Sequence, residues 1–493
     1  MKVDRYLPYC GIALGVAITI LLHIQGISYT YVGVTISVFS LIYLLVSKKK
    51  ERLLAINLHY ILLVVSFTVV YLVSVLLLFQ SQGEARPVGF FICCVLLGLI
   101  IGLVIYTKST RPAIVMILLL AFLLRWSILN VYPNNFLGSD PQNTYLWYEN
   151  LASGTDIHSS YNHTPLHLYL VVGLIKLGLA TKWAMMFSLG VLEVLSLLFI
   201  YLLGKRLFNI QVGLLAMLIL ACDNLHTMWG WYIVAQSLGI FLFSAIVYPV
   251  ITYRHNRWQL PLILVLIVLL TLSHSLSLMV TSLVIGLVII FRVAYQVATK
   301  QKIELELPIA CLLMLIITVA FWEYTTMLDN YIYMWKSNPA LAQSTIPILT
   351  LPPAIASTSA QWLPLLTELN RASYYLLYGL SIVGLLFIWR KDTKSFSLSL
   401  TCLALSGVIF YCYFFSHAPL AIDRWFVFLH ILLAVPCAVG ILSLAKSTKS
   451  DYIQLVLYTI ILFLLIGFSI TSATAFDSPI YRSITMTPDW LPQ

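Results

Sequence analysis

The sequence predicts an all-α polytopic membrane protein with about 15 transmembrane helices. Hydrophobic residues make up 61 % of the 493 residues and charged residues only 9 %, and the mean hydropathy is +0.96. A water-soluble domain needs more charged surface than this to stay dispersed. The long apolar runs have the length of membrane-spanning helices, and the alternating polarity of an outer-membrane barrel is absent.

Charge and cysteine usage exclude two other classes of protein. The net charge is +10, but the basic residues stand in short clusters between apolar runs, which is the topology signal of a membrane protein rather than a nucleic-acid-binding surface. Nearly all of the eight cysteines lie inside apolar runs without metal-ligand spacing. They are therefore predicted to be small hydrophobic residues of helix cores.

Residues 1–111 are predicted to form an accessory N-terminal block of four membrane helices. The first apolar run follows a charged start, as in a signal peptide, but no convincing A-x-A cleavage site follows, so it is kept as a membrane helix. The basic sequences KKKER and TKSTR alternate with weakly charged loops, which places the N-terminus and both sequences in the cytoplasm. The expected helices are 7–26, 29–47, 53–79 and 88–106.

Residues 112–371 are predicted to form a central core and residues 372–493 a C-terminal block with an external tail. The core holds a large external loop, 131–183, and a second external segment, 323–371. The second segment is too apolar for a solvated loop and too rich in Pro and Ser for a spanning helix, so we expect it to be partly re-entrant. The expected helices are 112–130, 184–203, 208–224, 233–252, 259–273, 275–298, 306–325, 372–389, 395–415, 425–444 and 452–471.

The segment 163–182 is predicted to lie in the membrane interface without crossing. Its uninterrupted apolar stretch, Leu168 to Ile175, is too short for the roughly 30 Å of hydrocarbon. At helical period, His163, His167 and Lys176 leave one side able to face water. Counting spans from the basic loops near the N-terminus and from those near the C-terminus gives the same topology only if this segment does not cross the membrane. The N-terminus is then inside and the C-terminus outside.

The external loop 131–183 is the predicted place of the chemistry. A chain this poor in charge gathers six titratable groups there, which favours a functional site. They are Asp140, Glu149, Asp156, His158, His163 and His167.

Three short motifs carry a resemblance to a known family. Gly138-Ser139-Asp140 follows an outgoing helix, His163-Thr164-Pro165-Leu166 opens the interfacial helix, and Lys-Arg-Leu-Phe stands at 205–208. With the arrangement of helices and loops over 112–371, they resemble the GT-C superfamily of integral-membrane glycosyltransferases, which includes protein O-mannosyltransferases and the lipid A aminoarabinose transferase. The four preceding helices depart from the family, and the Trp-Trp-Asp-Tyr-Gly signature of oligosaccharyltransferase is absent, which puts N-glycan transfer in doubt.

The resemblance implies an enzyme that moves a sugar from a polyprenyl-phosphate carrier to a hydroxyl of a glycan, lipid or protein. The site would face outward from a bacterial or archaeal plasma membrane, or into the lumen of the endoplasmic reticulum of a eukaryote. Asp140 is the expected general base, by analogy with the acidic residue of the family's first loop. The lipid-phosphate sugar is the expected co-substrate. A divalent cation at Asp223 and His226 is weighed but not favoured, because two ligands do not define a metal site, and these residues are instead expected to lie in a solvated external turn.

Further residues near the predicted outer face are candidates for binding donor or acceptor. The departing phosphate gains charge, so cationic and hydrogen-bonding groups are expected beside it. The alternatives are a membrane-anchoring Arg, a structural His, or an Arg paired with a neighbouring acid. Glu193 falls inside a spanning run and is expected to have a partner that the sequence does not name. The candidates are Arg125, Glu149, His163, Asp223, His226, His274, Lys336, Arg371 and Arg424.

Two other functions remain open from the sequence. A polymerase or ligase that uses a lipid-linked glycan also has many helices and a late external loop. A transporter or lipid flippase is the alternative outside the enzymes. It should carry ionisable groups and broken helices near the midplane in two related halves, whereas the sequence has no detectable internal repeat.

Overall fold

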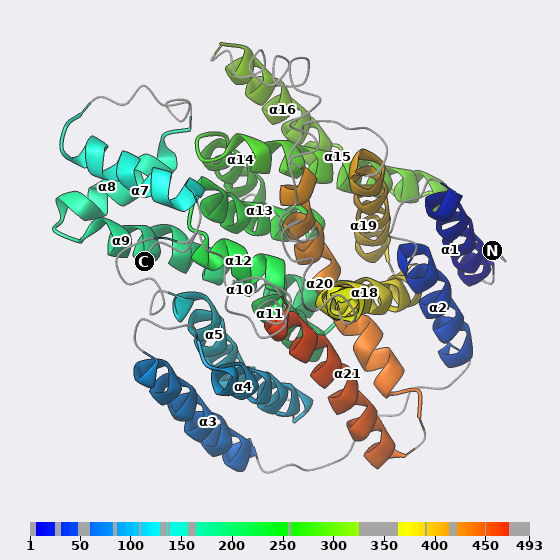
Figure 1. The fold of residues 1–493 in the computed structure, drawn as a ribbon. Coiled ribbons are helices and arrows are strands. Elements are labelled where there is room, and N and C mark those ends of the chain that lie inside the picture. Colours follow the sequence, from blue (N-terminus) through cyan, green and yellow to red (C-terminus); the bar gives the residue numbers. More distant parts are fainter. Residues whose placement is uncertain are drawn as a thin grey trace.

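The computed structural model describes residues 6–24, 31–47, 60–81, 86–107, 110–128, 136, 139–155, 164–254, 258–324, 363–389, 392–413, 422–448 and 450–472. Every regular element in these ranges is a helix, so the all-α fold class is confirmed (Figure 1). The eight cysteines are all free, and five of them are buried among apolar side chains.

Ten of the described helices are long and apolar enough to cross a membrane, or up to eleven if one bent pair counts as a span, so the chain is a multi-pass integral membrane protein. The ten are α1 (Leu7–Ile24), α3 (Tyr60–Gln80), α4 (Val88–Tyr106), α10 (Val191–Leu207) with the turns that precede it, α15 (Ser275–Ala298), α16 (Glu306–Tyr324), α18 (Leu363–Ile388), α19 (Thr393–Tyr411), α20 (Phe426–Ala445) and α21 (Asp451–Thr471).

Five shorter helices occupy the remaining predicted ranges. They are α2 (Tyr31–Val46), α5 (Thr110–Trp126), α11 (Ile210–Cys222), α13 (Ala235–Ile251) and α14 (Gln259–Thr271). A helix therefore lies in each of the fifteen ranges, while fifteen complete crossings stay a prediction.

Helix α20 is the central element of the bundle. It is apolar on all sides, and 94 % of its 18-residue apolar stretch is buried inside the structure, as expected of a helix surrounded by others. It packs against α18 and α11, so residues from the last third of the chain lie beside residues from the middle (Figure 1). The α18 contact is close because Gly384 faces Gly440, and a Cβ on Gly384 would lie 1.8 Å from the carbonyl oxygen of Pro436.

The four N-terminal helices divide into two pairs. The pair α1–α2 contacts α18 through α2, where the ring of Tyr43 packs edge-on against Phe387, whereas α3 packs on α4, and α4 on α5 and α21 (Figure 1). The domain limits at residues 111 and 371 stay predictions.

Two helices lie in the described part of the loop 131–183. They are α7 (Ser139–Ala152) and α8 (Leu166–Lys176), which pack against each other and against α9 (Thr181–Met185) (Figure 1). Pro141 stands in the first turn of α7, where the missing N–H costs nothing. The 11 residues of α8 extend only about 16 Å, half of the hydrocarbon thickness, which is consistent with an interfacial helix.

The segment after α11 differs from its expected form. It was predicted to be a solvated external turn, but Asn224–Trp231 forms α12, a helix buried on nearly every residue and bent 61° from α11. Asp223 produces the break, because its side chain caps α12 by accepting a hydrogen bond from the backbone N–H of His226 at 2.9 Å. The chain therefore turns inward where sequence patterning predicted an exit into water.

Candidate functional site

Helix α12 is the centre of the candidate site, because three groups of polar side chains meet on it. We name them the Asp140 cluster, the Glu193 network and the Asp223 network. Each joins residues from helices far apart in the chain, and each includes at least one residue of α12 or of its two flanking positions.

The Asp140 cluster is the accessible group. Asp140 lies in the first turn of α7, and its Oδ2 is 2.8 Å from Nη2 of Arg424, in the 3-10 turn Ile422–Trp425 before α20. The side chains are 45 % and 34 % exposed respectively, so solvent and ligands reach both. The guanidinium lies 5.7 Å from the centre of the Trp229 ring, and the amide of Gln236 donates to the carbonyl oxygen of Arg424 at 3.4 Å. A carboxylate and a guanidinium thus share one accessible position, and the buried ring of Trp229 packs against the guanidinium.

Tyr232 ends α12 beside this cluster. Burial, reinforced by the negative charge of Asp140, raises the pKa of the Tyr232 hydroxyl to about 12. The phenol is therefore protonated at any physiological pH and acts as a hydrogen-bond donor or acceptor rather than as a base.

Two neutral histidines flank the Asp140 cluster. His274 caps α15, with its Nδ1 2.8 Å from the hydroxyl of Ser277, and burial together with the nearby charge of Arg424 lowers its pKa to about 3. His167 of α8 has its Nδ1 2.8 Å from the hydroxyl of Tyr148, and burial lowers its pKa to about 3. Both imidazoles are uncharged at neutral pH, so the positive charge of this region comes from Arg424.

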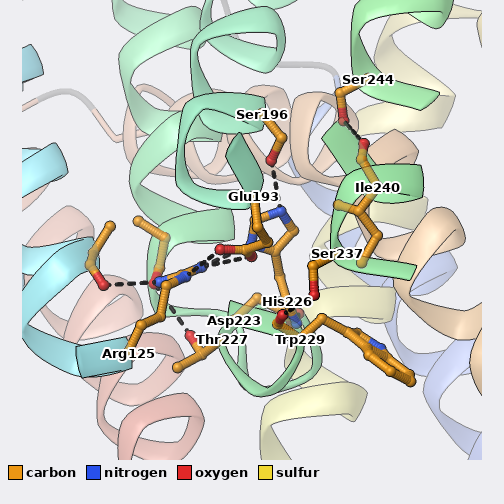
Figure 2. A network of polar contacts seen from close by, with 12 residues as sticks. Arg125, Glu193, Ser196, Asp223, His226, Thr227, Trp229, Ser237, Ile240 and Ser244 are labelled. Carbon is orange, nitrogen blue, oxygen red and sulfur yellow. Dashed lines mark hydrogen bonds and ion pairs between the residues drawn. The ribbon is translucent and has the colours of Figure 1, made fainter. Parts of the chain in front are cut away.

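The Glu193 network lies inside the bundle and supplies the partner that the sequence could not name (Figure 2). Nε of Arg125, on α5, is 2.8 Å from Oε2 of Glu193, on α10, and both side chains are fully buried. Nδ1 of His226 is 2.7 Å from Oε1 of Glu193, and its Nε2 is 2.9 Å from the hydroxyl of Ser196. The guanidinium also donates to the carbonyl oxygens of Ala121 and Ala221. Every charge in this network is matched and hydrogen-bonded.

Gly230 closes the network on one side. A Cβ at this position would lie 2.4 Å from Cδ of Arg125 and 2.6 Å from Oε2 of Glu193. Only glycine lets α12 approach the ion pair this closely.

The Asp223 network lies at the other end of α12. Oδ1 of Asp223 is 2.8 Å from Nδ1 of His430, and Nε2 of His430 is 2.8 Å from the hydroxyl of Tyr378. His430 is buried on α20 and Tyr378 comes from α18, so this chain of contacts fastens α12 to the central helix pair. Both carboxylate oxygens of Asp223 have protein partners, one in His430 and one in the N–H of His226.

The structure unites some of the predicted site residues and separates others. Asp140 meets Arg424, and Arg125 meets His226, but Arg125, expected near the outer surface, is fully buried. Glu149 is exposed at the far end of α7, where it accepts a hydrogen bond from Tyr145. Arg371 is partly buried in α18, and His163 and Lys336 lie outside the described residues.

The residues of the three groups that were missed in the sequence include Ser196, Tyr232, Tyr378 and His430. His430 had a signal, because it interrupts the apolar run FLHILL, and an ionisable residue inside a membrane helix usually has a functional or structural partner. The two tyrosines and Ser196 had none, because polar groups of this kind are common in membrane helices.

The described residues hold no group of three or more His, Cys, Asp or Glu side chains that could bind a metal ion. No family model and no curated protein matches the sequence. The function is therefore inferred from the residues and their geometry.

Proposed function

We propose that the protein is an integral-membrane glycosyltransferase that moves a sugar from a polyprenyl-phosphate carrier to an acceptor hydroxyl. The fifteen-span topology, the GT-C-like core and the outward-facing site belong to this proposal. The observation that supports it is the Asp140–Arg424 pair at 2.8 Å, because a carboxylate and a guanidinium meet at an accessible position between the start of α7 and the turn before α20.

The reaction needs both charges. The acceptor oxygen attacks the anomeric carbon as the bond from that carbon to the phosphate oxygen breaks. The hydroxyl proton passes to a carboxylate oxygen of Asp140, and the bonding electron pair leaves with the polyprenyl phosphate. A single displacement of this kind inverts the anomeric configuration.

Arg424 has two roles in this scheme. In the empty protein it orients the Asp140 carboxylate, and with donor bound it stabilises the phosphate as that group gains negative charge. The buried ring of Trp229 packs against the guanidinium and helps to hold it in place. Tyr232, protonated, supplies a hydrogen bond beside the carboxylate.

A transporter is the second candidate, and one observation favours it. Helix α12 continues α11 after a 61° break, and buried charges surround the break on both sides. Broken helices with buried ionisable groups are typical of substrate sites in transporters. Against this reading, Glu193 and Asp223 are already saturated by partners within the protein.

Sugar transfer by purified protein in proteoliposomes tests the proposal. The donors are polyprenyl phosphates that carry radiolabelled mannose, glucose or arabinose, and the acceptor is a total lipid and glycan extract of the host membrane. Asp140→Asn keeps the size of the side chain but removes the base, so we expect transfer to fall roughly 10² to 10⁴-fold. Asp451→Asn is the matched control, because Asp451 also lies in the first turn of a helix, α21.

The outcomes separate the candidates. Loss of transfer in Asp140→Asn, with transfer retained in Asp451→Asn, supports the enzyme. Transfer at the wild-type rate by Asp140→Asn refutes the assignment of the base. Label that crosses the bilayer with its bond to phosphate intact identifies a transporter.

A further inference from the structure

Helices α13 and α15 connect the Asp140 cluster to a second polar region. Gln236, near the start of α13, contacts Arg424, and His274 caps the start of α15 beside it. The 17 residues of α13 then extend about 25 Å, close to the thickness of a bilayer core, before the helix ends at Ile251. The far ends of both helices therefore lie at the opposite end of the bundle from Asp140.

At that end of α13, three cationic side chains gather around the consecutive residues Thr252, Tyr253 and Arg254. Nζ of Lys394, from the first turn of α19, donates to the carbonyl oxygen of Thr252 at 3.0 Å. Nη2 of Arg292, from the last two turns of α15, donates to the carbonyl oxygen of Tyr253 at 3.2 Å. Residue 254 is itself an exposed Arg. Together with Arg206, at the end of α10, these side chains form what we call the basic cluster, and Arg206, Arg254 and Arg292 all lie within electrostatic range of Lys394.

Part of this charge has an ordinary structural role. The carbonyl end of a helix attracts cations, and Lys394 and Arg292 bind the carbonyl groups that follow α13. These two bonds occupy Nζ of Lys394 and Nη2 of Arg292. They leave Arg206, Arg254 and Nη1 of Arg292 unexplained.

The acids near the basic cluster are few and already engaged. Glu304 pairs with Nη2 of Arg292, Glu306 accepts a hydrogen bond from the hydroxyl of Tyr253 at 3.2 Å, and Asp392 caps α19. Within the described ranges, Arg206 and Arg254 have no acidic partner, Lys394 feels the charge of Asp392 without an ion pair to it, and Nη1 of Arg292 is buried without an acceptor. Like charges held this close repel one another, and a buried N–H without an acceptor costs free energy.

We propose that the basic cluster binds a phosphate group, from an anionic lipid headgroup or from a soluble phosphate. A phosphate bridges several cations at once and accepts hydrogen bonds from guanidinium N–H groups in a matching planar geometry. The site lies at the end of the bundle that the basic loops assign to the cytoplasm, where anionic lipids attract Lys and Arg. It is separate from the Asp140 cluster and does not depend on sugar transfer.

The test compares two charge-matched double variants. Arg206→Gln with Arg254→Gln removes two exposed cations of the basic cluster and breaks no side-chain bond among the described residues. Arg111→Gln with Lys446→Gln removes two cations outside it, one in the first turn of α5 and one at the end of α20. Both variants are checked for monodispersity and for wild-type thermal stability in phosphatidylcholine nanodiscs.

Two probes distinguish the source of the phosphate. The first is phosphatidylglycerol, titrated into phosphatidylcholine nanodiscs, with lipid retained on the protein counted by native mass spectrometry. The second is inorganic pyrophosphate, added to protein in neutral detergent, with binding measured by calorimetry. We expect one probe to bind the wild type and the control, and to bind the basic-cluster variant about 25-fold more weakly, since each cation contributes roughly fivefold.

Phosphatidylglycerol binding alone identifies a lipid site, and pyrophosphate binding alone identifies a site for a soluble ligand. Equal binding by the two double variants overturns the proposal, as does a wild-type protein that binds neither probe. Lys394→Gln, which retains a side-chain donor for Thr252, should weaken the same probe about fivefold. If it does not, Lys394 is only a helix cap.

Discussion

Glu193→Gln is the substitution that most directly tests the buried charge network. The change keeps the shape of the side chain and removes its negative charge. It leaves the guanidinium of Arg125, which is fully buried, with neutral partners only: the new amide oxygen, the carbonyl oxygens of Ala121 and Ala221 and the ring of His226. The ion pair with Arg125, at 2.8 Å, loses its negative partner, and so does the contact at 2.7 Å with Nδ1 of His226.

The magnitude follows from the burial. Breaking a buried ion pair by removing one partner costs about 3 to 5 kcal/mol, because the remaining charge has no solvent to stabilise it. An unfolding entropy of about 2.1 cal/mol/K per residue gives roughly 1 kcal/mol/K over the 493 residues, so we expect the apparent Tm to fall by about 3 to 5 °C. Glu149→Gln is the control, because that exposed carboxylate can lose its charge with little effect, about 0.5 kcal/mol at most.

The assay is heating of detergent-solubilised protein at one fixed rate, followed by size-exclusion chromatography of what remains folded. A double variant, Arg125→Met with Glu193→Leu, removes both charges and should be less destabilised than Glu193→Gln, since neither charge is then buried alone. A Tm for Glu193→Gln within about 1 °C of wild type would refute the reasoning, because it would mean that Arg125 is compensated by something other than Glu193.

Two further predictions use the same assay. Gly384→Ala should destabilise the protein by about 1 to 3 kcal/mol, because the new Cβ would lie 1.8 Å from the carbonyl oxygen of Pro436. The control is Gly407→Ala, in open space on α19, which should be neutral or stabilising. Equal Tm values for the two variants would contradict the close α18–α20 contact. The free energy of unfolding should also decrease as the pH is lowered below 6.5. The reason is that burial holds the pKa of His167 at about 3 in the folded protein, against 6.5 in the unfolded chain. The unfolded chain alone binds this proton below pH 6.5, so His167 accounts for a loss of about 2 kcal/mol at pH 5. His167→Gln should remove this share and leave the similar share of His274; an unchanged pH profile would show that the His167 imidazole titrates normally.

The sequence also singled out several of the residues that matter. Asp140 was selected because titratable groups gather in its loop in a chain of 9 % charged residues, and Arg424, Arg125, Asp223 and His226 were selected as groups near the predicted outer face. The roles of these residues could not be read from the sequence. Asp223 was weighed as part of a solvated turn, and it proved to be the buried cap of α12, because the cap bond and His430 together compensate the burial of its charge.

What the sequence by itself determined is the class of the protein and the positions of its long apolar helices, whereas α7 and α12 were not predicted. Hydrophobicity accumulated over about 20 consecutive residues decides whether a segment enters a membrane, and that sum is a local property of the chain. Only the tertiary structure decided which charges meet: Arg125 and Glu193 are 68 residues apart, Asp223 and His430 are 207 apart, and Asp140 and Arg424 are 284 apart. Such pairs depend on which helix faces which, and in a bundle of uniformly apolar helices that choice comes from close packing at small residues and from the matching of buried charges, neither of which can be evaluated one segment at a time.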